Sequence, residues 1–184
     1  MTTEALSITT VVPAPAEAVF AVLADPARHA AIDGTGWVCG PLDGDRLTTS
    51  GQVFRMDMYH PNHPDGRYEI ANQVRELDPP RAISWEPGTE DARGRLSFGG
   101  WIWRYDLAPA ADGGTEVRLT YDWSGATAEA RRGIHFPPFD VEHLENSLRQ
   151  LAVLAAAWEP AQPIASPHRP WNTCGTGSTG GPPA

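Results

Sequence analysis

Three polar side chains suited to proton transfer share one face of two neighbouring predicted strands. Alternation places His60 at the end of the first strand, and Tyr68 and Asn72 on the inward face of the second. Histidine has an ordinary pKa near neutrality, so His60 could act as a base, with Tyr68 as a hydrogen-bond donor and Asn72 as a polarising group. Such a set could move protons to and from an enolisable carbon without a cofactor.

Each of these residues also has a purely structural interpretation. For His60 we favour that interpretation, in which the ring ends its strand in solvent, and Tyr68 can pack as part of the core. Asn72 is different, because an unpaired buried amide in the middle of a strand costs about 1–3 kcal/mol. The sequence therefore favours a pocket role for Asn72, a structural role for His60, and leaves Tyr68 open.

The remaining histidines carry weaker indications. Residues 60–65 contain two histidines and an aspartate, but they are also rich in turn formers, and we interpret them as a hairpin loop without a metal. His135 precedes 136–139 at the expected mouth of the sheet, where it could be a gate, a proton donor or merely structural. His143 lies on the last predicted helix, and we expect it to be exposed.

Composition excludes several classes of function. The 14 basic residues are all arginine, and the absence of lysine excludes lysine Schiff bases, pyridoxal-phosphate anchoring and the P-loop lysine. The 23 acidic residues give a net charge of -9, which argues against sequence-independent binding to nucleic acid or to anionic membrane. Hydrolase, dinucleotide and zinc motifs are also missing. We therefore expect no cofactor, no metal and no nucleic-acid partner.

The cellular setting is predicted from the cysteines and the first residues. Cys39 and Cys174 lie far apart without a ligand pattern, which indicates a reduced, cytoplasmic protein. The first residues lack a basic leader, and no apolar run approaches the roughly 20 residues of a membrane span. The lysine-free, alanine- and arginine-rich composition is typical of a high-GC bacterium. The oligomeric state is left open.

The elements that must position these side chains follow from periodicity and turn residues. We expect a domain over 1–159 and a flexible tail over 160–184, where proline, glycine, serine and threonine dominate, with Trp171 and Cys174 as exceptions. The predicted strands are 6–12, 37–41, 51–59, 67–77, 82–86, 96–107 and 115–123. Between them stand clusters of turn formers, including 87–88, and a bulge is expected at 99–100.

Helices are expected at two places. Two short helices follow the first strand, the second capped by Asp25 and Pro26. A long helix capped by Asp140 carries an apolar stripe from Val141 to Trp158, and at about 27–30 Å it would reach across a whole sheet. Short loops between strands predict an antiparallel meander. The fold class is therefore α+β, with a curved antiparallel sheet of about seven strands wrapped on the long helix.

The inward face of that sheet is dominated by large apolar and aromatic side chains. Alternation alone leaves a filled core and a ligand cavity equally open, because aromatic residues suit both. If there is a cavity, planar or polycyclic ligands would stack on the aromatic set. The residues expected to contact a ligand are Met56, Met58, Trp85, Trp101, Trp103, Tyr121 and His135.

Several segments resemble one superfamily. Residues 12–26 resemble the opening of the START-like superfamily, whose helix-grip fold is shared with the birch-pollen-allergen family. Residues 103–107, 120–125 and 135–139 resemble bacterial polyketide cyclase/dehydrase-like members. The resemblance spans 6–158, is specific for fold and weak for activity, and implies a deep hydrophobic cavity between the sheet and the C-terminal helix. It transfers no catalytic residue.

Three functional hypotheses follow. The first is a protein that binds a hydrophobic, cyclic, polyketide-like or lipid-like small molecule in the cavity. The second is a cofactor-independent polyketide aromatase/cyclase or dehydratase that uses His60, Tyr68 and Asn72. The third is an interaction module, which predicts an interior filled by tryptophan and an exposed apolar patch elsewhere. The sequence does not separate a binding protein from an enzyme.

Overall fold

Eight strands and four helices make up the part of the chain that the computed structural model describes, residues 4–158. The predicted tail over 160–184, with Trp171 and Cys174, lies outside the described residues. The strands are β1 (Ala5–Val12), β2 (Val38–Pro41), β3 (Val53–Tyr59), β4 (Arg67–Asp78), β5 (Ala82–Glu90), β6 (Leu96–Phe98), β7 (Ile102–Pro109) and β8 (Thr115–Asp122). The helices are α1 (Ala16–Leu23), α2 (Pro26–Ile32), α3 (Ala130–Gly133) and α4 (Glu142–Ala156).

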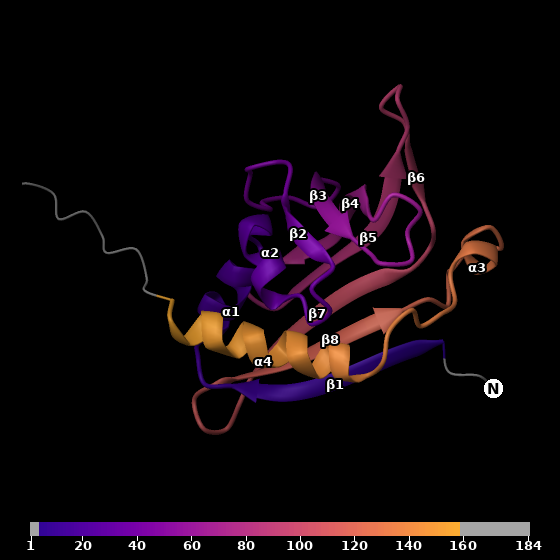
Figure 1. The fold of residues 1–184 in the computed structure, drawn as a ribbon. Helices are drawn as coiled ribbons and strands as arrows, with labels where there is room; N and C mark the ends of the chain where they lie inside the picture. Colours follow the sequence, from indigo (N-terminus) through magenta and orange to yellow (C-terminus); the bar gives the residue numbers. More distant parts are fainter. Residues whose placement is uncertain (1–3, 159–184) are drawn as a thin grey trace, which may run out of the picture.

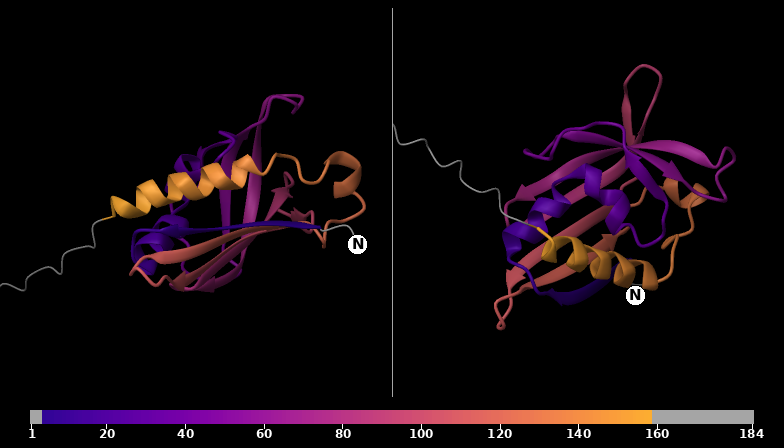
Figure 2. Two further views of the ribbon diagram at one scale, coloured as in Figure 1. Left: turned by 90° about the horizontal axis from the view of Figure 1, so that it is seen from below. Right: turned by 60° about the vertical axis from the view of Figure 1, so that its left-hand side comes forward.

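All strands belong to one antiparallel sheet that curves around the longest helix. The order is β1-β8-β7-β5-β4-β3-β2, and β6 pairs with β5 beside this path. Helix α4 packs against α1, α2 and β1 on one face of the sheet (Figures 1 and 2). The opposite face is not covered by a helix in these views. The predicted α+β helix-grip architecture is confirmed.

Helix α4 is held by the apolar stripe that the sequence predicts. Leu144, Leu148, Leu151 and Ala155 recur at spacings of three and four, and all four are buried. The expected cap was wrong: the helix begins at Glu142 after Val141, and no side chain caps it. Among residues 4–158, no helix is long and apolar enough to cross a membrane.

The two short helices form as expected, because their caps are local. The Asp25 carboxylate accepts a hydrogen bond from the backbone N–H of Ala27 (3.1 Å), and Pro26 occupies the first turn of α2. Helix α1 buries Val19, Val22 and Leu23 toward the core. After α2 the chain enters β2, the strand against which α2 packs, at one end of the sheet.

Two boundaries in the middle of the sheet differ from the prediction. Strand β5 does not stop at Pro87 but continues to Glu90, because it exchanges one partner for another there. Trp85 is its last residue paired with β7, and Gly88 is its first paired with β6. Pro87 falls between them, so its missing N–H removes no ladder bond on that side.

The predicted strand over 96–107 is correspondingly two strands. Instead of a bulge, Gly99 and Gly100 separate β6 from β7. Gly100 has a φ of 88° and donates its N–H to the Glu86 carboxylate (3.0 Å). A Cβ there would stand 2.0 Å from the Gly125 carbonyl oxygen, so only glycine fits this crossing.

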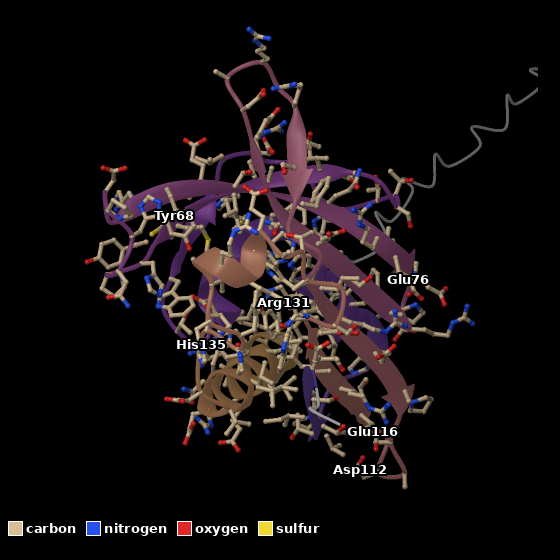
Figure 3. The ribbon with its side chains drawn as sticks, turned by 90° about the vertical axis from the view of Figure 1, so that its right-hand side faces the viewer. Tyr68, Glu76, Asp112, Glu116, Arg131 and His135 are labelled. Atoms are coloured by element: carbon tan, nitrogen blue, oxygen red, sulfur yellow. The ribbon has the colours of Figure 1, made fainter. Side chains whose placement is uncertain are left out.

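The outward face of the sheet binds its arginines to carboxylates. Arg55 bridges Glu90 (2.5 Å) and Asp43 (3.2 Å), as predicted for an outward side chain. Arg104 joins Asp106 and Glu76, the latter on the outer side of the sheet in Figure 3. The alternation is thus confirmed: charged side chains turn outward and aromatic side chains turn toward α4.

Candidate functional site

A cavity of about 920 Å³ lies between the inward face of the sheet, helices α2 and α4, and residues 127–139. Strands β3, β4, β5, β7 and β8 supply its apolar wall, because their inward positions carry methionine, phenylalanine, tyrosine and tryptophan. The segment around α3 lies at one end of the molecule together with Tyr68 and His135, the end that faces the viewer in Figure 3. A space of this size can hold a ligand of several fused rings.

Every residue predicted for the site lines this one cavity. They are His60, Tyr68, Asn72, Met56, Met58, Trp85, Trp101, Trp103, Tyr121 and His135. Their positions follow from strand alternation, since Met58 pairs with Tyr68 and Trp103 pairs with both Trp85 and Tyr121 across the sheet. What each residue does there remains a prediction.

His60 and His63 lie near Tyr68 at the more exposed end of the cavity. The Nδ1 atom of His60 accepts a hydrogen bond from the backbone N–H of Asn62 (3.1 Å), and the His60 ring meets Trp37 edge-on at 4.4 Å. His63 stacks on Tyr68 at 4.7 Å. Because Nδ1 of His60 accepts, the neutral ring carries its proton on Nε2 and presents a donor rather than a free lone pair.

Asn72 lies deeper along the same strand. It is 2% exposed and pairs across the sheet with Phe54 and Pro87. Its amide has no hydrogen-bond partner among residues 4–158, and its atoms are not sealed off, so they open into the cavity. It lies four positions after Tyr68, about 13 Å along a strand. A single small reacting group would not contact both.

An aromatic wall connects the two ends. The ring centroids of Trp103 and Tyr121 lie 4.6 Å apart, and Trp85 stacks on Tyr105 with ring centroids 5.7 Å apart. Phe139, from the segment after α3, stacks on Trp103 at 5.4 Å. The run of prolines and aromatics before α4 therefore packs onto the wall, at the side where the sequence places the mouth.

Burial raises the pKa of both Tyr105 and Tyr121. The phenols of the wall therefore stay neutral at physiological pH and keep their hydroxyl protons. They can donate to or accept from a ligand, but they carry no charge toward it.

His29 is the functional candidate that sequence reasoning missed. Its Nε2 atom lies 2.8 Å from the Leu23 carbonyl oxygen, and its ring stacks on Trp85 at 5.1 Å and meets Phe54 edge-on at 5.4 Å. Burial lowers its pKa, so the ring is neutral near pH 7. Its position one turn before Ile32, on the apolar face of α2, was the available indication.

His143 was expected to be exposed, and this was wrong. The loop after α2 places Asp33 and Trp37 against the first turn of α4. The His143 ring stacks on Trp37, with ring centroids 6.4 Å apart, and is tilted against the Phe139 ring at 4.5 Å. Its Nδ1 atom is enclosed, lacks a hydrogen-bond partner and lies 3.9 Å from the Asp33 carboxylate. Burial lowers the His143 pKa, and the Asp33 charge opposes this.

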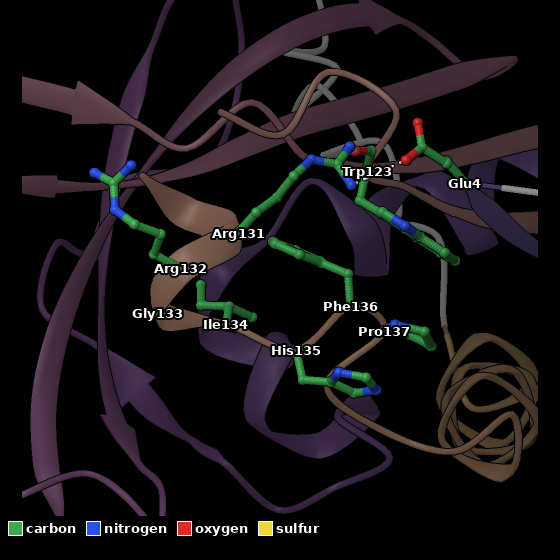
Figure 4. A pocket seen from close by; sticks show the side chains of 9 residues that line it. All are labelled: Glu4, Trp123, Arg131, Arg132, Gly133, Ile134, His135, Phe136 and Pro137. Atoms are coloured by element: carbon green, nitrogen blue, oxygen red, sulfur yellow. Dashed lines mark hydrogen bonds and ion pairs between the residues drawn. The ribbon is translucent and has the colours of Figure 1, made fainter. Parts of the chain in front are cut away.

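A second, more polar groove of about 620 Å³ adjoins the cavity. Arg131 forms an ion pair with Glu4 (2.9 Å) and donates to the carbonyl oxygen of Trp123 (2.9 Å), while Arg132 points to the other side of α3 (Figure 4). His135 borders both spaces. No group of three or more potential metal ligands occurs within the described part of the chain.

The chain matches a family of known proteins along most of its length. Residues 3–153 match the model of the family described as polyketide cyclase/dehydrase and lipid transport. Protein Ms6760 from Mycobacterium smegmatis has a similar structure, with a TM-score of 0.60 at 22% identity over 84% of this chain and 92% of that one. Protein CV1439 from Chromobacterium violaceum gives 0.58 at 23% identity over 83% and 96%. Both show the fold.

A curated relative extends beyond this chain. The uncharacterized protein Rv0088 of Mycobacterium tuberculosis is 30% identical over 125 residues, which is 68% of this chain and 50% of that protein. The chain thus spans about half the length of the curated relatives it matches.

Proposed function

Because this chain belongs to the polyketide cyclase/dehydrase and lipid transport family, we propose that it binds a hydrophobic, cyclic, polyketide-like or lipid-like small molecule. The observation that carries the proposal is the cavity of about 920 Å³ between the sheet and α4. Burial of this apolar lining by a ligand would contribute about 25 cal/mol per Å² of apolar surface removed from water.

The lining supports a planar ligand in particular. Trp85, Trp103 and Tyr121 all line the cavity, and their contacts with one another's neighbours include both stacked and tilted ring pairs, so a further aromatic ring would meet aromatic surface there. Asn72 and the wall tyrosines add a few neutral polar groups. This combination of broad apolar area and sparse hydrogen-bonding groups is typical of small-molecule sites.

Native mass spectrometry and tryptophan-quenching titrations test the proposal. Freshly purified protein is expected to carry a small molecule, or to be quenched at micromolar concentrations by one class in a panel of polycyclic aromatics and fatty acids. The variant Ile70→Trp places a large ring in the cavity and should weaken binding at least tenfold. Glu69→Trp is the matched control, since Glu69 is exposed on the opposite face of β4.

One set of results would contradict ligand binding in the cavity. If no mass is bound, no compound quenches, and Ile70→Trp behaves like Glu69→Trp, the interior does not serve a ligand. The interaction-module hypothesis would then take precedence.

The second candidate function is a cofactor-independent aromatase/cyclase or dehydratase that acts on the bound ligand. The unpartnered Asn72 amide and the Nε2–H of His60 favour it, because each offers a hydrogen bond to a ligand oxygen, at different ends of the cavity. Tyr68→Phe, Asn72→Ala and His60→Ala would then abolish turnover with binding largely retained. Equal losses of turnover and binding would leave only the binding function.

A further inference from the structure

Three polar but uncharged side chains line the inner end of the cavity. They are His29, Asn72 and Tyr105, and each is neutral at physiological pH. Among residues 4–158, the carboxylates that line the cavity are those of Asp33 and Glu129. The Asp33 carboxylate accepts hydrogen bonds from Thr35 and from the backbone N–H of Val38 (2.9 Å). A ligand group that reaches this end therefore meets hydrogen-bonding atoms and a negative charge.

None of the arginines in the described part of the chain lines the cavity. The sheet arginines Arg55 and Arg104 are bound to carboxylates on the outward face. Arg131, in the adjoining groove, is occupied by Glu4 and two backbone carbonyls. Since the chain also lacks lysine, an anionic group inside the cavity would lose its hydration without gaining a counter-charge.

His29 has a fixed tautomer that presents an acceptor. The Leu23 carbonyl can only accept, so the Nε2 atom of His29, 2.8 Å away, carries the proton. Nδ1 is then the lone pair. His143 Nδ1 is the one sealed, unpartnered side-chain atom found in residues 4–158, so the unpartnered Nδ1 of His29 is not sealed and opens onto the cavity that its ring lines.

We propose that His29 Nδ1 accepts a hydrogen bond from the ligand, and that the cavity therefore selects neutral aromatic ligands with a hydroxyl group and rejects carboxylates. The inference rests on the proposed function and deepens it. Because the His29 ring stacks on Trp85 and both residues line the cavity, a hydroxylated ring that donates to Nδ1 would lie beside the Trp85 indole.

Three compact probes of one shape test the selection by calorimetry at pH 7.5. They are naphthalene, 2-naphthol and 2-naphthoate. Small probes are used so that the 2-naphthoate carboxylate enters the cavity with its ring instead of staying at the rim near Arg132. 2-Naphthol should bind about fivefold more tightly than naphthalene, the value of one net hydrogen bond. 2-Naphthoate should bind at least about tenfold more weakly than 2-naphthol.

His29→Phe keeps an aromatic ring against Trp85 but removes Nδ1. It should lose the preference for 2-naphthol over naphthalene. If this variant does not fold, nitrogen NMR of the wild-type histidines tests the same proposal. We expect His29 to be the Nε2–H tautomer and its Nδ1 resonance to move when 2-naphthol is added.

The outcomes separate the two proposals. Three results would overturn the selection by His29 while leaving ligand binding intact. They are equally tight binding of 2-naphthoate and 2-naphthol, a preference for 2-naphthol that His29→Phe retains, and a proton on Nδ1 of His29. Failure of all three probes to bind would overturn ligand binding itself, and the selection with it.

Discussion

At the scale of single residues, the cavity is distinguished by histidines whose surroundings differ. His60 uses Nδ1 to accept a hydrogen bond from the backbone, whereas His29 uses Nε2 to donate one. His143 makes no ring hydrogen bond and is enclosed between Asp33, Trp37 and Phe139. The same side chain thus offers a donor, an acceptor and a buried neutral ring in one site.

The buried neutral histidines make stability depend on pH. Burial lowers the pKa of His29 and of His143 below the ordinary 6.5, so the unfolded chain binds more protons than the folded one just below that pH. The free energy of unfolding should be constant above about pH 7 and fall as the pH drops from 6.5 toward the folded-state pKa values.

Urea titrations at pH 7.5 and pH 5.5 measure this dependence. His143→Phe should be as stable as the wild type at pH 7.5, because the new ring packs on Phe139 and Trp103, and should lose less stability at pH 5.5. His29 still contributes, so the loss shrinks without disappearing. An identical loss in variant and wild type would show that His143 does not titrate below its ordinary pKa.

At the scale of elements, α4 is held to the sheet by one stripe. Leu151 is 0% exposed on that stripe, and its truncation to alanine should cost about 2–5 kcal/mol of the free energy of unfolding. Val153 is 67% exposed on the same helix, so Val153→Ala should change it by less than about 0.5 kcal/mol. Urea denaturation compares the two; similar costs would contradict the stripe.

Gly34, in the loop after α2, lies in close contact with the backbone of α4. The Gly34 N–H donates to Ser147 Oγ (3.1 Å), and a Cβ on Gly34 would stand 2.2 Å from the His143 carbonyl oxygen. Gly34→Ala should therefore destabilise the protein by about 1–3 kcal/mol. Gly40→Ala is the control, because a Cβ there meets nothing within 4 Å. Equal thermal unfolding temperatures for the two variants would argue against the close approach.

Local patterns predicted the elements well, and long-range contacts account for the errors. The α4 stripe, the Asp25 cap and the strand alternation depend on neighbours in the chain, and all were predictable. The continuation of β5 through Pro87 was not, because it requires an exchange of partners across the sheet. His29 and His143 were missed for the same reason: Trp85 and Asp33, which enclose them, come from distant segments.

At the scale of the whole molecule, the two faces of the sheet are chemically sorted. Arginine–carboxylate pairs cover the outer face, and aromatic and neutral polar groups line the cavity. A ligand that enters the cavity therefore stabilises the folded state through apolar burial rather than through charge. Its effect should be insensitive to salt.

Ligand binding should appear as thermal stabilisation. At 100 times its Kd, a ligand that binds only the folded state adds about 2.7 kcal/mol, which for a chain of this size raises Tm by about 5–11 °C. Differential scanning fluorimetry with 2-naphthol, in low and in high salt, measures the shift. Ile70→Trp, which should weaken binding at least tenfold, should show at most about half of this shift at the same ligand concentration; a shift of equal size in that variant would place the ligand elsewhere.

The strand order also begins and ends with two unequal edge strands, because an open sheet does not close on itself as a barrel does. On one side stands β2, only four residues long and ending in Pro41. On the other stands β1, with eight residues paired on one side to β8. Any assembly that grows by strand pairing needs a long backbone template without proline. Self-association of that kind would therefore proceed through β1, which contains no proline.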